Sequence, residues 1–218
     1  MIQLPAPKAV IFDMDGTLVD NMHFHHDAWM KFIHEKKLNI DADTFERDYH
    51  KGTLIEVMQR FFPHLKTEEE LRKVGDEKEA LFREMYRPHI KPIEGLMTFL
   101  THLKKAKIPF GLATMGDKNN MKMTLKGLGV SESFHSTTSG DLVTYGKPHP
   151  EIFITAAQKL NTAPSDCLAF EDTQSGITSA RAAGMQVVGV ATQFTESELL
   201  ELGCIHAISE YTGFWFAE

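Results

Sequence analysis

The sequence predicts an α/β protein in which a doubly wound parallel sheet carries an inserted block of helices. Short apolar runs of strand character alternate with amphipathic helical segments from about residue 92 onward. A similar run at 8–13 precedes this alternation, and the residues between them show only helical patterns. Alternating strands and helices are typical of a parallel sheet with helices on both faces. We therefore expect a core formed by residues 1–18 and 92–218 and a separate all-helical cap formed by residues 19–91.

The first predicted strand ends at two carboxylates and a glycine. Its apolar run at 10–12 suits a strand that is buried on both faces. If the chain stays extended, Asp13 and Asp15 project to the same side, and Gly16 then permits a tight turn. Two acids held together are costly unless they bind a cation or divide acid and base roles. The alternative is a strand followed by an acidic turn that binds nothing.

The block that follows is predicted to be all-helical, because its apolar residues recur at spacings of three and four. Lys51-Gly52-Thr53 interrupts this pattern. Thr67 and Glu70 have the spacing of a capping box at the start of the last helix. The predicted helices cover 21–37, 41–49, 54–62 and 67–87.

The remainder of the chain alternates between the two kinds of segment, with Gly184 ending one of its helices. We expect the last residues, Phe214-Trp215-Phe216, to plug a helix surface or a sheet edge. The predicted strands of the core are 8–13, 109–114, 134–138, 166–171, 187–190 and 205–208. Its predicted helices are 93–105, 118–128, 150–160, 175–183 and 196–202.

Composition argues against several classes of partner. The formal net charge of −7 argues against nucleic acid or an anionic membrane surface, because both require a basic face. No apolar run approaches the roughly 20 residues of a membrane span, and no signal-peptide pattern opens the chain. Cys167 and Cys204 are too few for a disulfide framework, which predicts buried thiols and a cytoplasmic location. We expect a monomer or a weak dimer.

Polar residues follow four of the predicted strands at the ends where a doubly wound sheet binds its ligands. They are Asp13 with Asp15, Thr114, Lys147, and Glu171 with Asp172. Mg²⁺ prefers oxygen ligands and takes a few carboxylates together with substrate phosphate, whereas lysine and threonine can hold phosphate oxygens. A cation and Lys147 would offset the repulsion between an attacking carboxylate and a phosphate dianion. The set therefore predicts Mg²⁺-dependent phosphoryl transfer, with Asp13, Asp172 and Glu171 as candidate metal ligands.

These residues carry a family resemblance that covers essentially the whole chain. In this order, Asp13-Met14-Asp15-Gly16-Thr17, Thr114, Lys147-Pro148 and Glu171-Asp172 resemble the four motifs of the haloacid dehalogenase-like superfamily. The resemblance implies a Rossmann-like core and a helical cap inserted after the first strand. It also implies that a cis peptide precedes Pro148.

The resemblance further implies a role for each motif residue. Asp13 would be the nucleophile that forms an aspartyl-phosphate, and Asp15 would be the general acid and base. Thr114 and Lys147 would bind the transferred phosphoryl group. The metal site would consist of Asp13, Glu171, Asp172 and the backbone carbonyl of Asp15.

Within this superfamily, the cap segment resembles that of the β-phosphoglucomutases. The residues that this likeness places at the substrate are His25, Lys51, Gly52 and Lys78 of the cap, with Lys118 and Asn119 as further candidates from the core. One position departs from the pattern: Ile55 stands where those mutases have an arginine that holds a second phosphate. A mutase must bind a bisphosphate intermediate at both ends, so losing a bidentate cation there is serious. Lys51, Lys78 and Arg60 are the candidates to compensate for it.

The sequence therefore predicts an enzyme that transfers a phosphoryl group from a small phosphorylated metabolite, with a sugar phosphate as the favoured substrate. The acceptor is left open, because a sugar hydroxyl would make the protein a mutase and water would make it a phosphatase. Hydrolysis of another monophosphate or of pyrophosphate is an alternative. More distant alternatives are a binding protein without catalysis and a phosphonate-cleaving enzyme that uses Lys51.

Overall fold

A six-stranded parallel sheet forms the centre of the computed structural model, which describes residues 2–41, 43–45, 49 and 52–217. The strand order is β4-β3-β2-β5-β6-β7, and every neighbouring pair is parallel. Each of the six strands predicted for the core is present. Their bounds are β2 (Ala9–Phe12), β3 (Phe110–Ala113), β4 (Ser136–Thr138), β5 (Cys167–Glu171), β6 (Gln186–Val190) and β7 (His206–Ile208).

Helices cover both faces of this sheet, as the alternation along β2 shows. Val10 and Phe12 belong to an apolar cluster with α5 and α6, whereas Ala9 and Ile11 belong to one with α7, α8 and α9. Successive side chains of a strand point to opposite faces, so one fully buried strand anchors both helical layers. The doubly wound arrangement is thus confirmed. These helices are α5 (Leu96–Lys105), α6 (Lys118–Gly127), α7 (Glu151–Lys159), α8 (Gln174–Ala182) and α9 (Glu196–Glu201), with short 3₁₀ turns η2 (Gly140–Leu142) and η3 (Pro164–Asp166).

The strand order reverses at β2. From β2 the chain passes through β3 to β4, and it then crosses to β5 on the other side of β2. Crevices at such a reversal, beyond the carboxyl ends of the strands, are the usual ligand sites of open α/β sheets. Asp13 and Asp15 directly follow β2 and so lie at this point.

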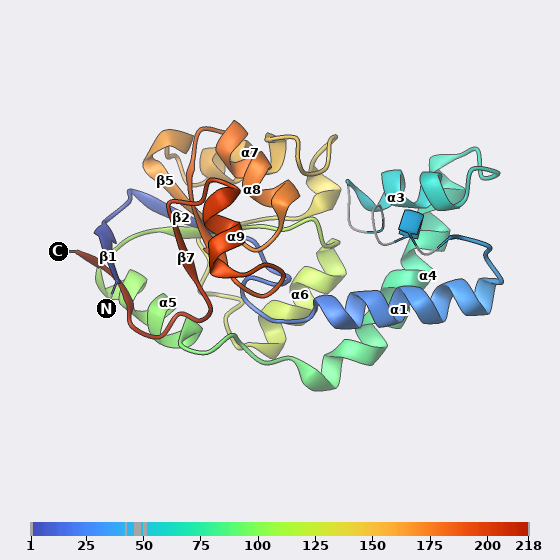
Figure 1. Ribbon diagram of the computed structural model, residues 1–218, viewed down its shortest axis with the longest axis horizontal. Coiled ribbons are helices and arrows are strands. Elements are labelled where there is room, and N and C mark those ends of the chain that lie inside the picture. Colours follow the sequence, from blue (N-terminus) through green and yellow to red (C-terminus); the bar gives the residue numbers. More distant parts are fainter. Residues whose placement is uncertain (1, 42, 46–48, 50–51, 218) are drawn as a thin grey trace.

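Helices α1 (Met22–Lys36), α3 (Leu54–Phe61) and α4 (Glu68–Tyr86) form the helical insertion, which stands at the opposite end of the molecule from both termini (Figure 1). They pack around an apolar cluster that includes Trp29, Phe32 and Phe61. The predicted capping box of Thr67 and Glu70 is present at the start of α4. Of the predicted helix at 41–49, residues 43–45 are helical, and several of the others lie outside the described residues. The status of 19–91 as a separate domain stays a prediction.

The first and last strands were not predicted. Strand β1 (Ile2–Pro5) pairs in parallel with β8 (Phe214–Ala217), which forms a small second sheet beside the core. Phe214 and Phe216 are buried, and both rings contact Phe99 of α5. The aromatic end of the chain therefore does plug a helix surface, but it does so as a paired strand. None of the helices in the described ranges is long and apolar enough to cross a membrane.

Candidate phosphoryl-transfer site

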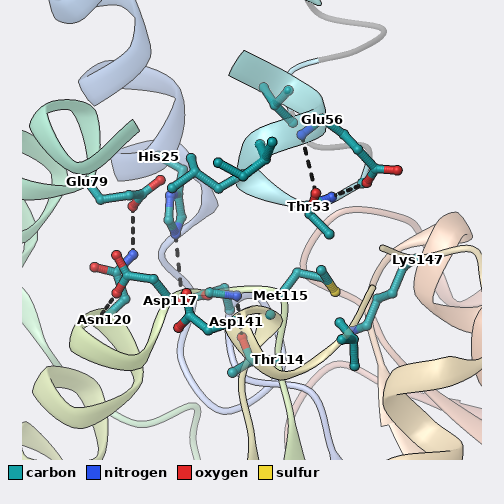
Figure 2. A pocket seen from close by; sticks show the side chains of 18 of the residues that line it. His25, Thr53, Glu56, Glu79, Thr114, Met115, Asp117, Asn120, Asp141 and Lys147 are labelled. Carbon is teal, nitrogen blue, oxygen red and sulfur yellow. Dashed lines mark hydrogen bonds and ion pairs between the residues drawn. The ribbon is translucent and has the colours of Figure 1, made fainter. Parts of the chain in front are cut away.

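A cavity of about 450 Å³ lies between the carboxyl ends of the central strands and the helical insertion. This size suits a small metabolite. Figure 2 shows how the two sides face each other, with His25, Thr53 and Glu56 coming from the insertion and Thr114, Met115 and Lys147 from the core. Of the predicted site residues, the cavity lining includes Asp13, Asp15, His25, Gly52, Lys78, Thr114, Lys147 and Glu171.

The Lys147 ammonium lies between two buried carboxylates at the core end of the cavity. It donates to Asp13 Oδ1 at 2.6 Å and to Glu171 Oε1 at 2.5 Å. Lys147 is 5 % exposed, Asp13 6 % and Glu171 fully buried. These hydrogen bonds are charge-assisted and shielded from water, so they hold the lysine firmly against Asp13. The peptide bond between Lys147 and Pro148 is cis, as the resemblance implied.

The shifted pKa values of these groups show that holding several buried carboxylates in their charged form is unfavourable without a further cation. Burial raises the pKa of Asp13 to about 8, although the Lys147 charge opposes the shift. Burial, with the neighbouring charges of Glu171 and Asp13, also holds the pKa of Asp172 well above its usual range. Burial alone would lower the pKa of Lys147, but the Asp13 and Glu171 charges hold it above its ordinary value. One lysine does not balance three buried carboxyl groups.

Asp13, Glu171 and Asp172 form the carboxylate cluster, in which one oxygen from each residue lies within 4.8 Å of the others. Thr17 Oγ1 donates to Asp172 Oδ1 at 3.0 Å, but the buried Oδ2 of Asp172 has no hydrogen-bond partner. A buried carboxylate oxygen without a donor calls for a cation. The donor set is all oxygen, which fits a hard divalent cation such as Mg²⁺. The Asp15 side chain is not part of this cluster.

The turn after β2 brings this cluster together. Gly16 adopts φ +79°, and a Cβ atom there would lie 2.0 Å from Asp172 Oδ2. Both facts require glycine at this position, which explains the sequence pattern of two acids followed by a glycine. On the other side of the cluster, the backbone N–H groups of Asp172 and Thr173 both donate to Glu171 Oε2 at 2.8 Å. Glu171 is therefore fixed by its own loop.

Asp15 lies beside the cluster and is held by the start of the insertion. Asn21 Nδ2 donates to Asp15 Oδ1 at 2.6 Å, and His25 Nε2 lies 3.7 Å from the same oxygen. The His25 ring stacks on Phe82 with ring centroids 3.6 Å apart, which fixes its orientation. The resemblance placed His25 near this aspartate, and the structure brings them together. The contact from Asn21 was missed, because its distance to Asp15 depends on how the turn closes.

Thr114 follows β3 and is buried at the floor of the cavity. Its Oγ1 accepts a hydrogen bond from Gly116 N at 3.0 Å. This bond orients the hydroxyl and leaves its own hydrogen available as a donor. Thr114 thus reaches the same cavity as Asp13 and Lys147.

A buried polar network connects α4 of the insertion with α6 of the core. Lys78 Nζ donates to Glu79 Oε1 at 2.8 Å and lies 3.4 Å from His25 Nδ1, and Asn120 Nδ2 donates to Glu79 Oε2 at 2.6 Å. Lys78, Glu79 and Asn120 are all buried. Although burial raises the pKa of Glu79, the Lys78 charge and these hydrogen bonds bring it below its ordinary value. Sequence reasoning found Lys78 and missed its two partners, because nothing in their spacing relates α4 to α6.

The first turn of α6 differs from expectation. Lys118 and Asn119 are exposed and do not line the cavity, whereas Asp117 and Asn120 do. Asp117 caps the helix by accepting from the backbone N–H groups of Asn119 and Asn120, each at 2.7 Å. The backbone N–H of Lys118 donates to Asp141 Oδ2 at 2.7 Å, at the edge of the cavity lining. The substrate-binding role predicted for Lys118 and Asn119 stays a prediction.

The loop before α3 closes the cavity on the insertion side. Gly52 lies so close to the core that a Cβ atom on Gly146 would be 2.3 Å from the Gly52 carbonyl carbon. Ile55, in the first turn of α3, lines the cavity, and so does Arg72 of α4, which sequence reasoning missed. The predicted contact of Lys51 falls outside the described residues.

Comparison with known proteins agrees with this geometry. A model of the haloacid dehalogenase-like hydrolases matches residues 7–184. A β-phosphoglucomutase of Bacillus subtilis is 30% identical over 191 residues, 84% of this chain and 83% of its own. A fructose-1-phosphate phosphatase of Escherichia coli is 27% identical over 181 residues, 83% of this chain and 95% of its own. The crystal structure of a HAD hydrolase of family IA from Entamoeba histolytica superposes with a TM-score of 0.84 at 31% identity, covering 95% of each chain.

Proposed function

Because the chain belongs to the haloacid dehalogenase-like hydrolase family, we propose that it transfers the phosphoryl group of a sugar phosphate through an aspartyl-phosphate on Asp13. The observation that carries this proposal is the Lys147 ammonium held between Asp13 and Glu171 at 2.6 and 2.5 Å, beside the unpartnered Oδ2 of Asp172. Relatives named for a phosphoglucomutase and a fructose-1-phosphate phosphatase support the class of substrate.

Asp13 and Asp15 divide the chemistry between them. An Asp13 carboxylate oxygen bonds to phosphorus as the bond to the leaving oxygen breaks, and Asp15 gives that oxygen its proton. In the second step Asp15 takes a proton from the acceptor, whose oxygen bonds to phosphorus as the Asp13–phosphorus bond breaks. Asn21 and His25 hold Asp15 in place for both transfers. The acceptor is water in a phosphatase and a sugar hydroxyl in a mutase.

The other residues of the core end bind the phosphoryl oxygens and balance charge. Lys147 and the Thr114 hydroxyl contact the transferred group. Asp13, Glu171, Asp172 and the Asp15 carbonyl would hold Mg²⁺, and the Oδ2 atom of Asp172, which has no hydrogen-bond partner, is the clearest candidate ligand atom. Mg²⁺ at this site would neutralise part of the charge on the phosphate as Asp13 approaches.

The helical insertion completes the site by covering the sugar and excluding water from the reacting atoms. His25, Lys78 and Gly52 reach the cavity from that side. We place the protein in the cytoplasm, since its two cysteines are buried free thiols and carry no disulfide.

The test is a phosphate-release screen over sugar phosphates, nucleotides and pyrophosphate, with Mg²⁺ or with a chelator. We expect Mg²⁺-dependent release from sugar monophosphates and a loss of at least about 1,000-fold in kcat/KM for Asp13→Asn. Asp27→Asn, which changes an exposed aspartate of α1, is the matched control and should retain full activity. Retained activity in Asp13→Asn, or no turnover of any phosphorylated compound, would overturn the proposal.

A further inference from the structure

We infer that the substrate carries a single phosphoryl group and no second anionic group, so that water accepts the phosphoryl group and the protein is a monophosphate phosphatase. This inference rests on the proposed function and concerns the part of the cavity that faces away from Asp13. Its basis is the charge on the wall that the insertion contributes.

That wall is acidic. Glu68, Arg72 and Asp76 are spaced by four residues on α4, so they share one face of the helix, and all three line the cavity. Glu56 of α3 and Asp141 of η2 also line it. Figure 2 shows Glu56 on the insertion side and Asp141 on the core side of the same space. Three carboxylates of the insertion, together with Asp141 of the core, therefore stand against one guanidinium in this part of the cavity.

The cations of the lining already have carboxylate partners. Arg72 Nη2 donates to Glu68 Oε1 at 2.7 Å, and Arg72 Nη1 lies 3.9 Å from Asp141 Oδ1. Lys78 donates to Glu79 Oε1 at 2.8 Å in the buried network. Lys147 is held at the core end between Asp13 and Glu171. Among the lining residues that the structure describes, every lysine and arginine already has a carboxylate partner, so a second phosphate would have to compete with these acids for a cation.

Ile55 also gives a second phosphate no cation to bind, because it lines the same cavity and offers only a hydrocarbon surface. A second phosphate dianion on this wall would face carboxylates without a cation of its own. Like charges brought together in a binding site disfavour the ligand, and this is a usual source of specificity. A mutase must hold a bisphosphate in each catalytic cycle, whereas a monophosphate phosphatase places only the sugar hydroxyls against this wall.

The experiment compares related substrates with and without a second anionic group. The pairs are glucose 6-phosphate with glucose 1,6-bisphosphate, fructose 6-phosphate with fructose 1,6-bisphosphate, and glucose 6-phosphate with 6-phosphogluconate. We expect kcat/KM to be at least about tenfold lower for the doubly anionic member of each pair. The ratio of kcat/KM between the singly and the doubly anionic substrate should approach one as salt is added, because screening weakens charge repulsion but leaves steric exclusion unchanged. β-Glucose 1-phosphate with a trace of the bisphosphate should yield phosphate and no glucose 6-phosphate.

Two variants test whether the acidic residues of this wall cause the preference for singly anionic substrates. Asp76→Asn removes one negative charge from the wall. Glu68→Gln removes one negative charge and also frees Arg72 from its partner. Each variant should bring the ratio of kcat/KM between the two substrates of a pair closer to one. Glu69→Gln removes a charge from the adjacent exposed residue, which does not line the cavity, and should leave the ratio unchanged. Equal turnover of mono- and bisphosphates, or formation of glucose 6-phosphate, would overturn the inference alone. Absence of turnover of every compound would instead overturn the proposed function.

Discussion

The two ends of the cavity balance their charges in different ways. At the core end, the buried groups Asp13, Glu171 and Asp172 share one lysine, and the pKa of Asp13 rises to about 8 through burial. At the insertion end, the Arg72 and Glu68 side chains are 50 % and 69 % exposed, so water screens their interaction. Interactions between buried charges are strong and are easily lost on substitution, which suits the residues that make and break bonds. Interactions between charges screened by water are weaker and tolerate substitution, which suits residues that select among substrates.

The largest expected effect is at the buried lysine. Lys147→Met should lower kcat/KM by at least about 1,000-fold and destabilise the protein by about 3 kcal/mol, because it leaves Asp13 and Glu171 without their cation. Lys118→Met is the matched control, since it removes an exposed lysine at the same side of the core. Kinetics and chemical denaturation measure both effects. A comparable loss of activity in Lys118→Met would contradict the position that the structure gives it.

A smaller effect is expected where the two ends meet. A Cβ atom on Gly146 would lie 2.3 Å from the Gly52 carbonyl carbon, so Gly146→Ala should force the insertion loop away from the core. We expect kcat/KM for a sugar phosphate to fall about tenfold, because the cavity no longer closes fully over the substrate. Tyr145→Ala, which trims an exposed side chain of the same loop, serves as the control. Unchanged kinetics in Gly146→Ala would show that this contact does not matter for turnover.

The smallest expected effect is on how the stability of the protein depends on pH and on Mg²⁺. The pKa of Asp13 is raised from 3.8 to about 8, so between these values the folded protein binds more protons than the unfolded chain. The stability of the metal-free protein should therefore fall as pH rises through this window. Mg²⁺ competes with those protons, so the rise in Tm that it causes should grow over the same window.

Asp172→Asn tests whether this behaviour belongs to the carboxylate cluster. The amide keeps the shape of the side chain and removes one buried carboxyl group, so the metal-free variant should be about 1 kcal/mol more stable at alkaline pH. It should also lose the Mg²⁺-dependent rise in Tm. Thermal unfolding across a pH series measures both quantities. A rise in Tm with Mg²⁺ that is independent of pH, or that survives in the variant, would count against a metal site here.

The sequence was most informative at the core end. Asp13 and Thr114 directly follow strands, Glu171 ends one, and Lys147 lies in the loop beyond another. Parallel strands bring their carboxyl ends to one edge, which predicted that these residues meet, and the family resemblance supplied their expected roles. The same reasoning could not relate α4 to α6, because the angle at which two helices pack is decided by side chains far apart in the chain. Glu79, Asn120 and Arg72 were missed for that reason.

Two other differences have physical causes that the sequence pattern does not show. Asp117 caps α6 and lines the cavity whereas Lys118 is exposed, and the spacing of residues after Thr114 does not show this difference. Within the described residues, strand β1 pairs with β8 alone, at the far end of the chain, so no neighbouring strand or turn in the sequence indicates it. Short strands whose partner is distant in sequence are the hardest elements to predict, since neither alternation nor a nearby turn identifies them.

The central claim is that Asp13 carries the phosphoryl group during turnover. Asp15→Asn with p-nitrophenyl phosphate tests it directly, because this leaving group needs no proton while the second step still needs the base. After an acid quench, peptide mass spectrometry should find a phosphoryl adduct on Asp13 at about one per chain, and none when Asp13→Asn is added. Phosphate release without an adduct on Asp13, or an adduct on another residue, would contradict the account.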